Sequence, residues 1–116
     1  MNNRDHQIII RILEEIKVIE DLINDFGLER FALDERTKRA ACMTLINIGE
    51  LTKSLTGEFR ESHNHISWKA IAGMRDITAH KYQTLKTGDV WTTLVNDIPR
   101  LRRQLHDILN DIGTSE

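Results

Sequence analysis

Four side chains with reactive groups lie within eight residues in the stretch RDITAHKY, residues 75–82. Arg75 carries a permanent positive charge, and His80 can exchange a proton near neutral pH. Asp76 adds a carboxylate and Tyr82 a hydroxyl. On a helix Asp76 and His80 share a face, whereas Arg75 and His80 diverge by about 140°. One interpretation is therefore an Asp76–His80 pair at a helix end, where the C-terminal dipole favours a protonated histidine.

The alternative interpretation of this stretch is cleavage of an RNA phosphodiester bond without a metal ion. That reaction needs a base for the 2′-hydroxyl, an acid for the leaving 5′-oxygen and a cation for the negative phosphorane. Histidine can act as acid or base, and arginine can hold a phosphate through two parallel hydrogen bonds. One Arg75–His80 set on one helix cannot surround a phosphate. Two sets facing each other across the two-fold axis of a homodimer could do so.

The composition is typical of one soluble domain spanning residues 1–116. The 16 basic and 18 acidic residues give a net charge of −2, so there is no basic excess to indicate nucleic-acid binding, although a local basic patch is compatible with it. The single cysteine, Cys42, excludes an internal disulfide, and its apolar neighbours indicate a buried thiol in a reducing compartment. No apolar run reaches the length of a membrane span and no signal peptide is visible, so we expect a cytoplasmic protein.

Apolar residues recur at spacings of three and four along most of the chain, which predicts an all-α fold. Gly27 is expected to end the first helix, Asp34 to cap the start of the second, and Gly57 to end it. Ser67 is the expected N-cap of a shorter third helix. These four helices predict an antiparallel up-down bundle, with room for an extra short helix. The expected helices cover residues 9–26, 34–57, 68–80 and 89–112.

Two residues inside the expected helices, Gly49 and Pro99, are of types that disfavour a helix interior. Gly49 costs up to about 1 kcal/mol relative to alanine in a helix, so close packing is its expected reason. Pro99 removes one helical hydrogen bond and predicts a kink at residues 95–98. Outside the helices, residues 58–66 (EFRESHNHI) are expected to form a polar connection and residues 86–88 a turn.

Basic side chains on two segments could form a patch that follows RNA phosphates. Lys81 lies within the reactive stretch and Lys86 shortly after it, and the last helix carries further arginines. The other interpretation is a solvated helix face whose charge is balanced by nearby aspartates. The arginines concerned are Arg100, Arg102 and Arg103.

Two aromatic pairs also have a functional and a structural interpretation. His63 and His65 lie in a polar segment without a cysteine or carboxylate cluster at ligand spacing, so no metal site is expected. Trp68 and Trp91 could stack on bases, but helical spacing favours a core position in which they clamp the third helix against the fourth.

The sequence resembles the HepT-like (DUF86) proteins of the HEPN superfamily. The resemblance covers nearly the whole chain and includes the amphipathic first helix, NIGELTKSL, ISWKAIAGMRDITAHKY and VWTTLVNDIPRL. The family signature Arg-x4-His-x-Tyr is met by Arg75, His80 and Tyr82. The family commonly has asparagine where this chain has Asp76.

The resemblance implies a specific activity and a specific form of control. HepT-like proteins are toxins of two-gene toxin–antitoxin modules and act as metal-independent ribonucleases on tRNA or mRNA, with no cofactor. It makes Arg75 and His80 the catalytic pair and Asp76 a polar helper. It also implies that a partner nucleotidyltransferase of the MntA type silences the toxin by joining AMP to Tyr82. Members typically form homodimers and can assemble further with the antitoxin. Some domains of the superfamily do not cleave RNA, so the alternative is a non-catalytic interaction or substrate-binding subunit of a nucleotidyltransferase complex.

Overall fold

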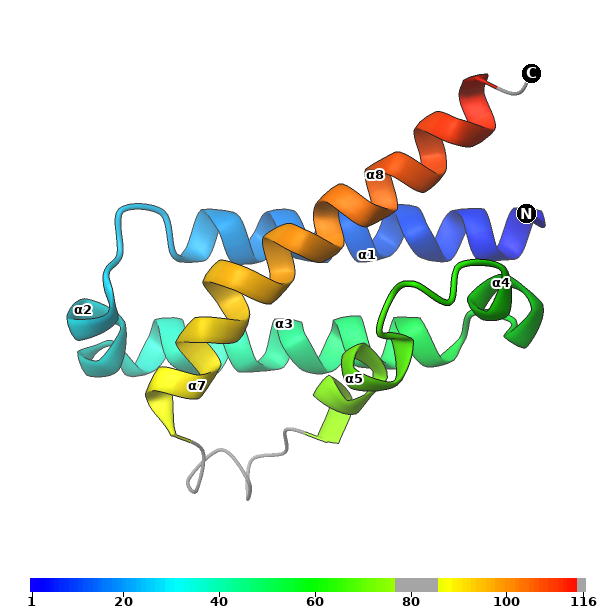
Figure 1. Ribbon diagram of the computed structural model, residues 1–116. Coiled ribbons are helices and arrows are strands. Elements are labelled where there is room, and N and C mark those ends of the chain that lie inside the picture. Colours follow the sequence, from blue (N-terminus) through cyan, green and yellow to red (C-terminus); the bar gives the residue numbers. More distant parts are fainter. Residues whose placement is uncertain (77–85, 115–116) are drawn as a thin grey trace.

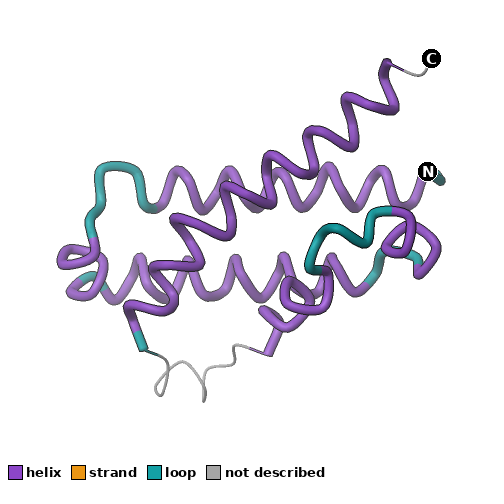
Figure 2. The backbone as a smooth tube through the Cα atoms, viewed as in Figure 1, coloured by secondary structure: helices purple, strands orange, loops and turns teal. Residues whose placement is uncertain are grey.

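The computed structural model describes residues 1–76 and 86–114, and side chains up to residue 111. Helices dominate these ranges, and no strand occurs within them (Figure 2). In chain order the helical elements are α1 (Asn3–Leu22), α2 (Leu28–Leu33), α3 (Glu35–Lys53), α4 (Gly57–Ser62), α5 (Trp68–Ala72), the 3₁₀ helix η1 (Gly73–Asp76), α7 (Thr87–Thr92), the π-helical turn η2 (Thr93–Asp97) and α8 (Ile98–Thr114).

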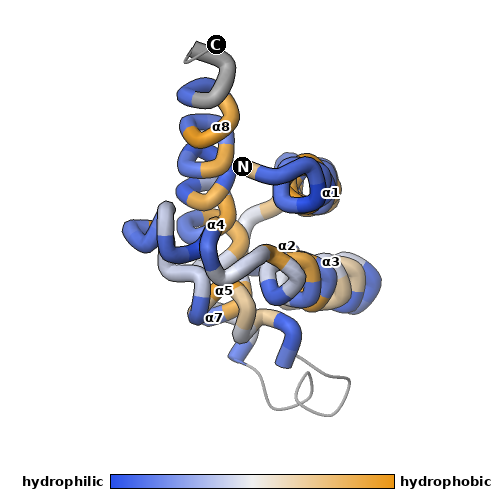
Figure 3. The backbone as a smooth tube through the Cα atoms, turned by 90° about the vertical axis from the view of Figure 1, so that its right-hand side faces the viewer, coloured by the Kyte–Doolittle hydropathy of each residue, from blue (hydrophilic) through white to orange (hydrophobic). Residues whose placement is uncertain are grey.

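The helices form two layers. The long helices α1 and α3 lie side by side and run in opposite directions, while α7, η2 and α8 form one continuous rod that crosses them obliquely (Figure 1). Viewed end-on, α4, α5 and α7 lie with α8 on one side of the α1–α3 pair, and the apolar stretches of α8 face that pair (Figure 3). The prediction of an all-α bundle is confirmed. Within the described residues, no helix is long and apolar enough to cross a membrane.

The core is built from the apolar stripes predicted for the three longest elements. Four isoleucines of α1 are completely or almost completely buried, and each fully buried side chain of this size contributes about 1.5–3 kcal/mol. The stripe of α3 includes Thr52, whose hydroxyl donates to the carbonyl of Ile48 at 2.8 Å and so leaves no unpaired polar group. Leu55, just after α3, and Leu94 of η2 extend these stripes. The buried members are Ile9, Ile12, Ile16, Ile19, Ala41, Leu45, Ile48, Thr52, Leu55, Leu94, Ile98, Leu101, Leu105 and Ile108.

A buried carboxylate joins the first turns of α1 and α4. Asp5 is 2% exposed, and its backbone N–H donates to the side chain of the N-cap Asn2 at 2.7 Å. The two carboxylate oxygens of Asp5 accept from the backbone N–H of Thr56 at 2.9 Å and from its hydroxyl at 2.7 Å. The hydroxyl oxygen of Thr56 in turn accepts from the N–H of Phe59 and caps α4. Segments 51 residues apart in the chain are thereby fixed to each other.

The first helix ends before Gly27. Helix α1 stops at Leu22, and the chain turns at Asp25, whose φ of 64° lies in the left-handed region. Aspartate tolerates this region better than most residues because its short side chain can bond locally. Gly27 is instead the N-cap of α2, a short helix that the sequence pattern did not reveal.

Two segments expected to be non-helical are helical. The predicted polar connection at residues 58–66 contains most of α4, because Thr56 caps it and Phe59 is buried. Gly57 therefore begins α4, whereas α3 ends at Lys53. The predicted turn at residues 86–88 is the start of α7, with Lys86 as its N-cap. The predicted cap at Asp34 is confirmed, since its carboxylate accepts from the N–H of Thr37 at 3.0 Å.

The helix departs from regular α geometry at the place where Pro99 predicted a kink. A π-helical turn, η2, occupies residues 93–97 directly before it, and the N–H of Ile98 donates to the carbonyl of Thr93. Pro99 has no N–H to donate, and its ring would clash with the carbonyl of Val95 in a regular α-helix. The wider π turn relieves both problems.

Trp68 is buried in the core, whereas Trp91 is partly buried and packs against the core. Trp68 is 6% exposed, packs 5.8 Å from the Phe59 ring and donates its indole N–H to the carbonyl of His63 at 3.0 Å. Trp91 packs 5.1 Å from the Phe31 ring of α2. The predicted core position is confirmed for Trp68. The ring contacts join α5 to α4 and α7 to α2, and not the expected third helix to the fourth.

We predict that Asp5→Ala lowers the free energy of unfolding by about 2–3 kcal/mol, because the N–H and hydroxyl of Thr56 lose a charged acceptor. Urea unfolding followed by circular dichroism measures the effect. Asp21→Ala is the matched control on the same helix, since Asp21 makes an exposed ion pair with Lys17 and should cost less than about 0.5 kcal/mol. Equal losses in the two variants would contradict the role assigned to the buried carboxylate.

Candidate functional site

Arg75 lies at the end of a short helical arm. Helix α5 extends from Trp68 to Ala72 and then tightens into η1, which ends at Asp76. Ser67 occupies the predicted N-cap position of α5 but makes no side-chain cap hydrogen bond. The third helix expected at residues 68–80 is therefore helical through Asp76, with a change of pitch at Gly73.

The arm packs backbone against backbone on α3. A methyl group added at Gly49 would overlap the backbone nitrogen of Arg75 and lie 3.0 Å from the carbonyl oxygen of Ala72. No side chain fits between the two elements at this point. The close packing predicted for Gly49 is confirmed, and its partner is the segment that carries Arg75.

The Arg75 guanidinium is held at the surface by two carboxylates. Its Nη1 lies 3.5 Å from Oε1 of Glu50, and its Nε lies 3.9 Å from Oδ1 of Asp76. The Arg75 side chain is 39% exposed and the two carboxylates are 60% exposed. Ion pairs this exposed add little stability, so a phosphate can compete for the guanidinium.

The other predicted members of the reactive stretch, His80, Lys81 and Tyr82, lie outside the described residues. The arm that ends at Asp76 and the start of α7 at Thr87 face the same edge of the molecule (Figure 1). Within the described residues, the predicted catalytic residues are Arg75 and Asp76, which are neighbours in the chain and whose charged groups lie 3.9 Å apart.

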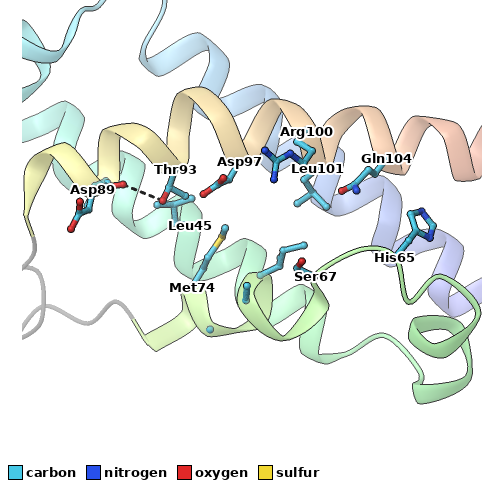
Figure 4. A pocket seen from close by; sticks show the side chains of 14 residues that line it. Leu45, His65, Ser67, Met74, Asp89, Thr93, Asp97, Arg100, Leu101 and Gln104 are labelled. Atoms are coloured by element: carbon cyan, nitrogen blue, oxygen red, sulfur yellow. Dashed lines mark hydrogen bonds between the residues drawn. The ribbon is translucent and has the colours of Figure 1, made fainter.

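A groove that the sequence did not reveal lies between the α5–η1 arm and the α7–η2–α8 rod (Figure 4). Its volume is about 540 Å³, and η1 borders it through Gly73 and Met74, the two residues before Arg75. Apolar side chains of both layers and a mixed polar set line it. Three of its lining residues, Ser67, His65 and Arg100, stand out in the sequence, each for a different reason. The π turn before Pro99 contributes Thr93 and Asp97. The charged and amide-bearing lining residues are His65, Asp89, Asp97, Arg100 and Gln104.

The basic residues proposed for an RNA-binding patch lie in different places. Arg100 lines the groove, whereas Arg102 points toward α1, where its guanidinium lies 3.0 Å from the carboxylate of Glu20. Arg103 and Lys86 are exposed. On α8, the arginines are therefore spread over more than one face.

The ring centroids of His63 and His65, between α4 and α5, lie 6.3 Å apart, and the His63 centroid lies 4.7 Å from that of Phe59. Burial lowers the pKa of His63 below its ordinary value of 6.5, and the charges of His65 and the N-terminal ammonium act in the same direction, whereas Asp111 opposes them. Within the described ranges, no group of three or more His, Cys, Asp or Glu residues could hold a metal ion.

Cys42 is buried in α3, as its apolar neighbours predicted. Burial raises the pKa of its thiol, and the nearby Lys38 lowers it by a smaller amount. A buried thiol with a raised pKa is a poor nucleophile, so Cys42 is a core residue.

The comparison with known families identifies the chain. A family model described as "Ribonuclease HepT-like" matches residues 12–108. The chain belongs to the HepT-like ribonuclease family. The match extends from α1 to α8 and includes both Arg75 and the segment 77–85.

Several relatives carry ribonuclease names. A protein of Caldanaerobacter subterraneus subsp. tengcongensis named "Putative RNase" is 38% identical over 84% of this chain and 88% of its own length. A "Probable ribonuclease HepT" of Thermococcus cleftensis is 34% identical over 78% of this chain and 83% of its own. A "Gamma-glutamylcyclotransferase and putative RNase" of Methanocaldococcus jannaschii is 37% identical over 90% of this chain, which spans only 47% of that protein. No solved structure gives a significant match.

We predict that the stability of this HepT-like chain falls as the pH is lowered through about 6.5. The unfolded chain then binds a proton at residue 63, while the lowered pKa keeps folded His63 neutral. The loss should level off below the folded-state pKa. Urea midpoints at several pH values between 8 and 5 measure it, and His63→Gln should give a flatter profile. A profile of unchanged slope in that variant would show that His63 does not cause the pH dependence.

Proposed function

We propose that this protein is the toxin of a two-gene toxin–antitoxin module and cleaves tRNA or mRNA without a metal ion. The observation that carries the proposal is an exposed arginine, Arg75, held at the end of the η1 arm within the family signature Arg-x4-His-x-Tyr. The ribonuclease names of the relatives support the reaction class. Arg75 offers a guanidinium with exposed donors, which suits bidentate binding of a phosphate.

In the proposed reaction the 2′-oxygen of the RNA attacks the adjacent phosphorus. One copy of His80 removes the 2′-hydroxyl proton, and a second copy gives a proton to the leaving 5′-oxygen. Arg75 stabilises the negative charge of the phosphorane, and Asp76 acts as a polar helper. The products are a 2′,3′-cyclic phosphate and a 5′-hydroxyl.

The proposed active form is a homodimer. Arg75 lies on a surface, and a single cation held there cannot enclose a phosphate. Two copies related by a two-fold axis would place Arg75 and His80 on both sides of one cleft. Lys81, Lys86, Arg102 and Arg103 are the proposed contacts to the rest of the RNA, since each adds positive charge outside the reacting phosphate.

Control of the toxin is proposed to act on Tyr82. A partner nucleotidyltransferase of the MntA type would transfer AMP to its hydroxyl, and the toxin dimer could assemble further with this antitoxin. The adduct would stand two residues from His80 and carry a negative phosphate. It would therefore block the cleft and repel RNA.

The alternative function is a non-catalytic interaction subunit of a nucleotidyltransferase complex. The observation in its favour is the pairing of Arg75 with Glu50 and Asp76, which neutralises the cation in the structure described. In this case Arg75 is a surface ion pair and Tyr82 is only a modification site. Growth arrest upon expression of the chain alone would favour the toxin.

We predict that the unmodified protein cleaves total tRNA or mRNA in the presence of EDTA, and that Arg75→Ala and His80→Ala each lower the rate by about 100-fold or more. Gel analysis of the RNA measures cleavage, and size-exclusion chromatography checks that the variants remain dimers. Arg39→Ala is the control, because Arg39 makes a surface ion pair with Glu35 on α3. Loss of cleavage with EDTA would contradict the metal-free mechanism, and an inactive unmodified dimer would favour the alternative function.

We predict that Tyr82→Phe cleaves RNA like the wild type and is no longer silenced by the nucleotidyltransferase and ATP, because it lacks the acceptor hydroxyl. Intact-mass spectrometry measures the AMP adduct, and the RNA assay measures silencing. Addition of AMP to the variant at full stoichiometry would exclude Tyr82 as the acceptor.

A further inference from the structure

We propose that Gly49 and Glu50 of α3 are positioning residues for Arg75, with Gly49 fixing its backbone and Glu50 fixing the direction of its guanidinium. This inference rests on the proposed function, because the position that matters is the one from which Arg75 binds the reacting phosphate. Neither residue would touch the RNA for this role. Each would act through Arg75.

Gly49 fixes the backbone of Arg75, because the three atoms nearest to a Cβ added at Gly49 are all backbone atoms. An added Cβ would overlap the nitrogen of Arg75 and lie 3.0 Å from both the Ala72 oxygen and the Arg75 Cα. A flexible side chain could rotate away from such a contact, but backbone cannot. Any residue other than glycine would therefore push η1 off α3 and move Arg75 with it.

The close approach is specific to this glycine. Four other glycines that the structure describes have nothing within 4 Å of an added Cβ, and one of them, Gly73, begins η1 itself. Glycine is disfavoured in a helix interior, and Gly49 lies in the middle of the 19-residue helix α3. The contact with η1 gives a physical reason for its presence there. The four open glycines are Gly27, Gly57, Gly73 and Gly88.

Glu50 lies at the border of the same contact. Consecutive helical residues point about 100° apart, so Gly49 faces the arm while the side chain of Glu50 leaves α3 toward the solvent. Its Oε1 reaches Nη1 of Arg75 at 3.5 Å from an element that Arg75 does not belong to. An arginine side chain has several rotatable bonds, and this ion pair restricts them. An ion pair so exposed contributes little to folding, which makes a role in orientation testable apart from stability.

The two carboxylates that pair with Arg75 lie on different elements and therefore have different effects on it. Asp76 moves with η1, since it follows Arg75 in the chain, whereas Glu50 is fixed to the long helix α3. Glu50 therefore relates the guanidinium to the rigid part of the fold. A catalytic group displaced by about 1 Å can lose about two orders of magnitude in rate. The expected signature is a change in kcat larger than the change in KM.

The experiment compares Gly49→Ala and Glu50→Gln with the matched control Gly73→Ala in single-turnover and steady-state cleavage of one RNA. We expect Gly49→Ala to lower kcat at least 10-fold and Glu50→Gln to lower it about threefold or more, the latter with an unchanged melting temperature. Gly73→Ala should retain wild-type cleavage, since its Cβ enters open space. Wild-type kcat in both Gly49→Ala and Glu50→Gln would overturn the inference.

A double-mutant cycle tests whether the effect passes through Arg75. In an Arg75→Lys background, which keeps the charge but not the planar fork, Glu50→Gln should cause little further loss. An equal loss from Glu50→Gln in both backgrounds would mean that Glu50 acts by another route and would overturn its assignment.

A measurement without RNA separates the inference from the proposed function. The Nε–H resonance of Arg75, assigned by its absence in Arg75→Ala, should shift in Gly49→Ala and Glu50→Gln and stay in place in Gly73→Ala. If the wild type does not cleave RNA, the proposed function fails while this resonance still tests the positioning. A resonance that does not move in either α3 variant would overturn the positioning itself, even if Gly49→Ala were too unstable to assay for cleavage.

Discussion

The burial of the isoleucine stripe of α1 is the interaction on which the rest of the fold depends. Four isoleucines that are at most 1% exposed lie on one face of this helix, and the apolar residues of α3 and α8 complete the same core. This packing makes α3 a rigid platform with one face in the core. The α5–η1 arm then rests on a further part of the surface of α3, so the position of Arg75 depends on a helix that it does not belong to.

The long elements were predictable because their stability comes from apolar stripes, and spacings of three and four reveal such stripes directly. The cap at Asp34 and the packing role of Gly49 were also predictable, since each follows from the requirements of a single residue. The short helices α2 and α4 were not. Each is six residues long, too short for a stripe, and depends on tertiary contacts of one buried ring, Phe31 or Phe59.

The candidate site was only partly accessible from the sequence. The signature pointed to Arg75 and Asp76, but spacing along one chain cannot reveal a partner 25 positions earlier such as Glu50. The same limit applies to Arg102, whose pairing with Glu20 on α1 depends on how α8 crosses the first helix. The buried Asp5–Thr56 link is a third case, since its two ends are joined only after α3 has returned the chain to the start of α1.

The π turn at residues 93–97 changes the direction in which side chains leave the α7–η2–α8 rod. In a continuous α-helix, Val90 and Ile98 would point about 80° apart, because eight residues exceed two turns. Both are nevertheless buried, as is Leu94 between them. The π turn holds more residues per revolution than an α turn. Buried residues spaced by four before Pro99 can therefore lie on the same face of the rod as buried residues spaced by three and four after it. The π turn before Pro99 thus allows α7 to pack on α2 while α8 packs on α1, without a break in the rod.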